Sequence, residues 1–262
     1  MKRLLKHEFF KVLNSLTIKI LLIVVAGFAI INELSLILLI EFAASAVGEE
    51  GGMLSGIFFQ GSQSMMASFD FLNLAIVMAI AIAVVTTYEY NSGSIKNTLL
   101  SDQTRITIYI AKYIVIITII TALVFINAFF QCGISLIAYG WGGIFSFQSL
   151  WSNYILILLL GLLLCYALAA MISFVAYATK NTVLTIVTIF GISVVIAIFS
   201  MIGMAGIRFF EWISQFSFTS VLSTYYISKE PIDLLYYFIT VAALFVPFFI
   251  GGLLVFKKQE IK

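Results

Sequence analysis

Residues that could perform acid–base or metal chemistry are scarce in this sequence. His7 is its single histidine, and its two cysteines, Cys132 and Cys165, both stand within apolar runs. A zinc site built from clustered histidines and cysteines therefore has no ligands. We expect the cysteines to be buried packing residues, because they define neither a disulfide framework nor a redox motif. Catalytic residues and metal ligands are thus predicted to be absent, and the chain is predicted not to be an enzyme.

One acidic pair needs a separate explanation. Glu49-Glu50 resembles the paired glutamates of CAAX-type membrane proteases, but Gly51-Gly52-Met53-Leu54 follow where that family has an arginine. Such an enzyme also needs a histidine at membrane depth, and His7 stands too near the start of the sequence. We interpret the pair as part of a solvated loop.

A nucleotide site is also missing. The motif G-x-x-x-x-G-K-[ST], whose backbone cradles phosphates, occurs nowhere in the sequence. No cofactor is expected in this chain, so an ATP-driven process would need ATP and magnesium on a separate polypeptide.

The composition is that of an integral membrane protein. Of the 262 residues, 63% are apolar and only 10% are charged, with a mean hydropathy of +1.15. Soluble domains are about half apolar and a quarter charged. No signal peptide is expected, because the first residues are charged and helical and the apolar run after Lys19 is too long.

Six apolar runs are long enough to cross a bilayer, which takes roughly 20 residues. They lack the alternation of a membrane barrel, so helices are predicted. The fold class is therefore an all-α integral membrane protein with six transmembrane helices in one domain over residues 1–262. The predicted spans are residues 17–40, 70–88, 106–131, 151–178, 183–204 and 234–256.

Basic residues predict the orientation. Of the 14 lysines and arginines, 12 fall at the two termini, around residues 89–112 or at Lys180, while only Arg208 and Lys229 fall on the other side. Cytoplasmic loops carry such an excess. Both termini and the segment 89–105 are therefore predicted to be cytoplasmic.

The first 15 residues predict a separate helix. Leu5, Phe9 and Val12 share one helical face, and most basic residues lie on the other. A basic amphipathic helix of this kind lies in the plane of the lipid headgroups. The alternative is a simple start to the first span.

Polar residues within spans are the default functional candidates in a bilayer. Glu33, Asn73 and Asn127 are our candidates for a substrate path. Glu33 could instead be an interfacial carboxylate where its helix leaves the membrane. The two asparagines could instead form hydrogen bonds between helices.

The segment 89–105 is a polar island between two apolar runs. Ser92-Gly93 ends one helix, Ser94 can cap the next, and Ile95 and Leu99 share a face beside Lys96. A short amphipathic coupling helix is predicted, which could dock in a groove of a soluble partner. The alternative is an ordinary solvated loop.

The island also resembles a known family. Glu89-x-x-x-Gly93-Ser94-Ile95-x-x-x-Leu99-Leu100, followed by Arg105 and Lys112, is similar to the signature of ABC-2 type permeases, as is the overall layout. The sequence departs from that signature at Asp102-Gln103, where proline is frequent, and at Ala111, where glycine often precedes the lysine.

The resemblance implies the membrane subunit of a bacterial ABC exporter. A separate ABC ATPase subunit would dock on a helix containing Ser94, Ile95, Lys96, Leu99 and Leu100. Glu89, Gly93, Arg105 and Lys112 would support the coupling, and Glu89 could pair with Arg105 or Lys96. Two permease subunits would form a homo- or heterodimer in the plasma membrane.

The resemblance further implies export of an amphipathic or toxic peptide, as in antimicrobial-peptide resistance and immunity. No nucleic-acid partner is expected. The alternative function is a non-transporting membrane scaffold or sensor that recruits a cytoplasmic regulator through the island.

Overall fold

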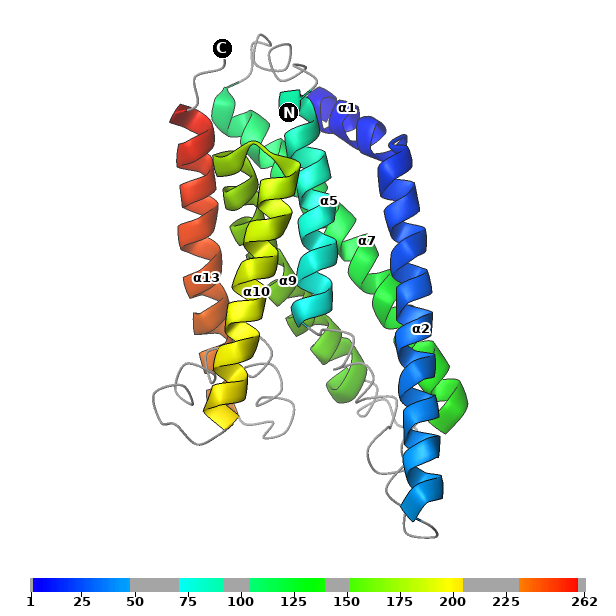
Figure 1. Ribbon diagram of the computed structural model, residues 1–262. Helices are drawn as coiled ribbons and strands as arrows, with labels where there is room; N and C mark the ends of the chain where they lie inside the picture. The colour runs from blue at the N-terminus through cyan, green and yellow to red at the C-terminus, as the bar shows by residue number, and fades with distance from the viewer. Residues whose placement is uncertain (1, 48–70, 92–103, 140–150, 205–230, 259–262) are drawn as a thin grey trace. The chain divides into compact units, whose positions relative to one another are not determined.

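The computed structural model describes residues 2–47, 71–91, 104–139, 151–204 and 231–258. Within these ranges every regular element is a helix and no strand occurs (Figure 1). The elements are α1 (Lys2–Leu13), α2 (Leu16–Val47), α5 (Phe71–Asn91), α7 (Arg105–Tyr139), the π-helical turn η1 (Trp151–Ile155), α9 (Leu156–Thr179), α10 (Thr182–Met204) and α13 (Pro231–Lys258). The all-α fold class is thereby confirmed.

Within the part of the chain that the structure describes, five stretches of helix are long and apolar enough to cross a membrane. They are Leu16–Leu38, Arg105–Ala138, Leu156–Thr179, Thr182–Phe199 and Ile232–Lys258. The remaining predicted span, at residues 70–88, falls on α5, in which a shorter apolar stretch covers Ala75–Thr87. The six-span count therefore stays a prediction. Helix α1 ends at Leu13 and α2 begins at Leu16, and the placement of α1 in the plane of the lipid headgroups stays a prediction.

The chain divides into two compact units. Unit 1 comprises Met1–Lys19, Phe71–Thr121 and Leu163–Lys262, and unit 2 comprises Ile20–Asp70 and Ala122–Leu162. The expectation of one transmembrane domain over residues 1–262 stays a prediction.

Within unit 1, α5 and α10 pack side by side (Figure 1). The hydroxyls of Thr87 and Thr182 are hydrogen-bonded to each other across this contact. Each helix satisfies its own backbone, and threonine hydroxyls such as that of Thr86 bond back to the preceding turn, here to the Ile82 carbonyl oxygen at 2.7 Å. The hydroxyls of Thr86, Thr87 and Thr182 thus have hydrogen-bond partners inside an apolar bundle.

The turn from α9 to α10 is built by two residues. Lys180 has a φ of 53°, in the left-handed region that ends many helices. Asn181 caps α10, since its Oδ1 accepts from the backbone N–H groups of Val183 at 2.9 Å and Leu184 at 3.3 Å. A two-residue connection therefore reverses the chain between two apolar helices.

Candidate coupling site

The polar island, residues 89–105, begins in the last turn of α5 and ends at the start of α7. α5 continues to Asn91, beyond the predicted span, and α7 begins at Arg105. Thr104 caps α7, because its Oγ1 accepts from the Thr107 backbone N–H at 3.3 Å. The predicted coupling helix and its docking residues lie at 92–103, outside the described residues. The structure consequently shows what surrounds the two attachment points of the island.

Arg105 connects the start of α7 to the end of α13. Its Nη1 donates to the Lys257 carbonyl oxygen at 2.7 Å, although Arg105 itself is exposed. A cation is favourable there, because the last carbonyls of a helix carry partial negative charge. Glu89, the partner expected for Arg105 or Lys96, lies in α5, but its side chain is outside the described part of the chain. The pairing of Glu89 stays a prediction.

Lys112 connects α7 to α1. Its Nζ lies 3.8 Å from Glu8 Oε1, and the two side chains are 5% and 4% exposed. Taking two charges out of water is costly, so removing either partner leaves an unfavourable buried charge. Sequence reasoning selected Lys112 through the family resemblance and missed Glu8. The signal for Glu8 was its position in α1, four residues before the buried Val12.

Aromatic and aliphatic side chains form a cluster in unit 1 near the start of α7. Its buried members are Ile108, Tyr109, Tyr177 and Phe256, with Leu4 and Tyr90 among the partly buried side chains against it. Together, residues from α1, α5, α7, α9 and α13 form this group, which we call the Tyr109 cluster. The Tyr109 cluster therefore brings Tyr90, at the end of α5, together with Ile108 and Tyr109, near the start of α7.

Tyr109 lies close to several other aromatic rings. Its ring centroid lies 5.5 Å from that of Tyr177, 5.4 Å from Phe249 and 5.9 Å from Phe256. Its hydroxyl donates to the Phe249 carbonyl oxygen at 3.2 Å. Edge-to-face and tilted rings at such distances attract each other beyond simple burial. Movement of α7 at Tyr109 would therefore be felt by α9 and α13.

A glycine permits this arrangement. A Cβ on Gly252 would lie 2.5 Å from the Tyr109 hydroxyl oxygen, closer than atoms can approach. The absence of a side chain at this position of α13 lets Tyr109 approach the helix backbone. Gly252 is a second residue that sequence reasoning missed, because its environment comes from a distant part of the chain.

Helix α1 contributes both packing and a cavity. Val12 is buried, and Leu5 and Phe9 are half-buried. The cavity, of about 370 Å³, is lined by Glu8, Lys11, Val12, Asn14, Ser15, Leu16, Thr17, Ile18, Val84 and Val85. Charged and apolar side chains both line this cavity.

The candidate path residues fall in both units. In unit 2, Glu33 is buried in α2, and Asn127 Oδ1 accepts from Gln131 Nε2 at 3.5 Å in α7. Asn73 belongs to α5 in unit 1, and its side chain is outside the described residues. Ser135, buried in α7, is a further polar residue that sequence reasoning missed.

Comparisons with known proteins place the chain in a family. No curated protein matches it. A family model described as "Protein of unknown function (DUF2705)" matches residues 11–262, nearly the whole chain. The chain therefore belongs to the DUF2705 family of proteins of unknown function.

Proposed function

We propose that the chain is the transmembrane permease subunit of an ATP-driven exporter in the bacterial plasma membrane, with six spans and both termini cytoplasmic. The signature of residues 89–112 and the absence of a nucleotide-binding motif in the sequence motivate this proposal. The observation that carries it is the anchoring of the island. Arg105, Tyr109 and Lys112 connect the start of α7 to α13, to the Tyr109 cluster and to α1.

The proposed mechanism transmits force from a partner ATPase. ATP-driven closure of an ATPase dimer would move a docking helix formed around Ile95 and Leu99. Because Tyr109 is packed against α9 and α13, a push on α7 would reach several helices at once. The two membrane states would interconvert because ATP changes the ATPase conformation that each state binds best. No catalysis occurs in this chain.

The proposed cargo is an amphipathic peptide or an apolar toxic compound, moved by a dimer of permease subunits. The apolar, phenylalanine-rich spans favour such a cargo over a sugar. Antimicrobial-peptide resistance or immunity is the corresponding physiological role.

Co-purification of an ATPase tests the docking step. In the double variant Ile95→Asp plus Leu99→Asp, charges on the apolar face of the predicted helix should abolish capture of an ABC ATPase. Asn97→Asp plus Ser101→Asp, on the opposite face, adds the same charge and should retain it. Capture that survives the first variant, or a captured regulator without ATPase activity, would refute the proposal.

A further inference from the structure

The cavity beside Glu8 forms where α1 turns into α2 (Figure 1). Its walls come from the second half of α1, the two-residue connection, the first turn of α2, and Val84 and Val85 of α5. All of these residues belong to unit 1. Its volume of about 370 Å³ falls in the range of pockets for small organic ligands, about 300–1,000 Å³. The cavity is therefore large enough to hold a compact organic group.

This cavity lies at the beginning of a candidate membrane span. Leu16, one of the lining residues, starts both α2 and the candidate span Leu16–Leu38. Directly after the cavity, α2 exposes the large apolar side chains of Ile20, Ile23 and Val24. In a bilayer, the end of such a span lies at the depth of the lipid headgroups. A lipid whose acyl chains lie along α2 would therefore bring its headgroup to the cavity.

The charged lining residues favour an anion. Lys11 is half-buried in the cavity wall, and the hydroxyls of Ser15 and Thr17 add hydrogen-bond donors. The acid of the lining, Glu8, lies 3.8 Å from Lys112, so Glu8, Lys11 and Lys112 together have a formal charge of +1. Residues 1–19 contain five lysines and arginines and one acid. A phosphate group would complement this excess of positive charge.

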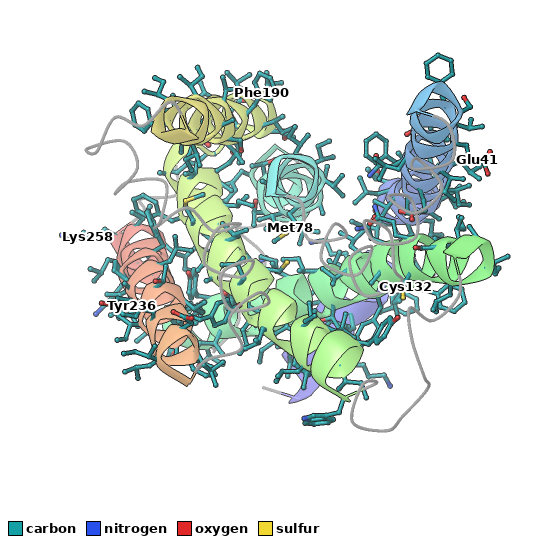
Figure 2. All side chains as sticks on the ribbon, turned by 90° about the horizontal axis from the view of Figure 1, so that it is seen from below. Glu41, Met78, Cys132, Phe190, Tyr236 and Lys258 are labelled. Atoms are coloured by element: carbon teal, nitrogen blue, oxygen red, sulfur yellow. The ribbon has the colours of Figure 1, made fainter. Side chains whose placement is uncertain are left out.

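Another part of the cavity wall is apolar. Val84 and Val85 are half-buried, and Val12 and Ile18 are buried. Met78 is fully buried on α5 (Figure 2). Val85 follows Met78 by about two helical turns and therefore lies on the same side of α5. A cavity with both a cation and an apolar wall suits a molecule that joins an anionic group to hydrocarbon.

We propose that this cavity binds the phosphate headgroup of an anionic phospholipid from the surrounding membrane. Lys11 is the counter-ion of the phosphate, and Val84 and Val85 contact the glycerol and the first acyl carbons. Because Glu8 lines the cavity and pairs with Lys112, the lipid lies beside the contact between α1 and α7. The inference goes beyond the exporter function and needs only that Leu16–Leu38 spans the bilayer. Binding is measured without an ATPase, so its failure leaves ATPase docking untouched.

Native mass spectrometry of the full-length protein, released from neutral detergent micelles, tests this site. Titration with dioleoyl phosphatidylglycerol counts the bound lipids and gives the Kd of the first one. Dioleoylglycerol has the same chains without the phosphate, and inorganic phosphate lacks the chains. We expect one saturable phosphatidylglycerol site and weaker binding of both reference compounds. Equal binding of dioleoylglycerol, or binding of inorganic phosphate as tight as that of the lipid, would overturn the proposal.

Matched variants locate the site. Lys11→Met should weaken the first lipid roughly tenfold, the loss expected for one charge-assisted hydrogen bond. Lys6→Met removes the same charge from an exposed position of the same helix and should change the Kd little. Equal losses in the two variants would indicate attraction to the basic surface as a whole and would overturn the proposal.

A second pair of variants tests the cavity without changing any charge. Val85→Phe fills the cavity and should also weaken the first lipid, whereas Val183→Phe, at an exposed position of α10, should not. Lys11→Arg keeps the positive charge and should retain the lipid, which decides the matter if Val85→Phe does not fold. Unchanged lipid binding in a folded Val85→Phe protein would contradict the proposed site, as would loss of the lipid in Lys11→Arg.

Discussion

Glu8 of α1 and Lys112 of α7 form an ion pair of 3.8 Å in which each side chain is at most 5% exposed. The pair joins the N-terminal helix to the helix that begins at the end of the polar island. Because both charges are buried, each depends on the other for its stability. The ion pair therefore connects α1 to α7, the helix through which we propose that force from the ATPase is transmitted.

Breaking this pair should destabilise unit 1. Lys112→Met leaves Glu8 as an unpaired buried charge, so we expect a loss of about 3–5 kcal/mol in the free energy of unfolding. The double variant Glu8→Gln plus Lys112→Met should recover most of this loss. Lys6→Met, an exposed lysine of the same helix, is the control. Unfolding in mixed micelles measures the parent and the three variants, and a double variant no more stable than Lys112→Met would contradict the pairing.

Gly252→Ala should strain the Tyr109 cluster. The added Cβ meets the Tyr109 hydroxyl oxygen at 2.5 Å, so we expect a destabilisation of about 1–3 kcal/mol. Tyr109→Phe removes that oxygen and should relieve part of the strain when combined with Gly252→Ala. Gly191→Ala, whose Cβ would meet nothing within 4 Å, should not destabilise. Equal melting temperatures for the parent and Gly252→Ala would disprove this close approach.

Asn181→Ala should weaken the start of α10. It removes the acceptor for the Val183 and Leu184 backbone N–H groups, at a cost of about 0.5–2 kcal/mol. Asn181→Asp keeps a capping oxygen and should remain close to the parent. Thermal unfolding followed by circular dichroism would measure both variants, and the idea fails if Asn181→Asp is destabilised as much as Asn181→Ala.

Glu89→Gln should uncouple the partner ATPase from transport. If Glu89 pairs with Arg105 or Lys96 at the end of α5, loss of its charge should reduce cargo-stimulated ATP hydrolysis and export while leaving the complex assembled. The reconstituted complex provides both measurements, and Glu41→Gln is a control for a lost acid elsewhere. Unchanged stimulation and export in Glu89→Gln would remove Glu89 from the coupling account.

The regular part of this fold was predictable from local sequence. Long apolar runs leave only helices to satisfy the backbone in lipid, and the break between α1 and α2 follows from the amphipathic pattern of residues 1–15. Helix α7 extends to Tyr139, beyond residue 131 where the predicted span ends, because apolar residues continue past Gln131.

The contacts of the candidate site were not predictable in the same way. Nothing local to Lys112 indicates Glu8, which is more than 100 positions earlier in the sequence, and nothing local to Gly252 indicates Tyr109. These relationships depend on how distant helices pack. Glu33 was selected as an intramembrane acid, but its burial depends on how its helix packs against others.

Photo-crosslinking from position 95 in intact cells tests the central proposal most directly. A crosslinking amino acid replacing Ile95 should capture one ABC ATPase polypeptide with a nucleotide-binding motif. The same amino acid replacing Val195, an exposed position on α10, should not capture it. Capture of the ATPase from position 95 alone is the predicted result. Capture of a protein without a nucleotide-binding motif, or no crosslink from position 95, would contradict the assignment of the chain as an exporter permease.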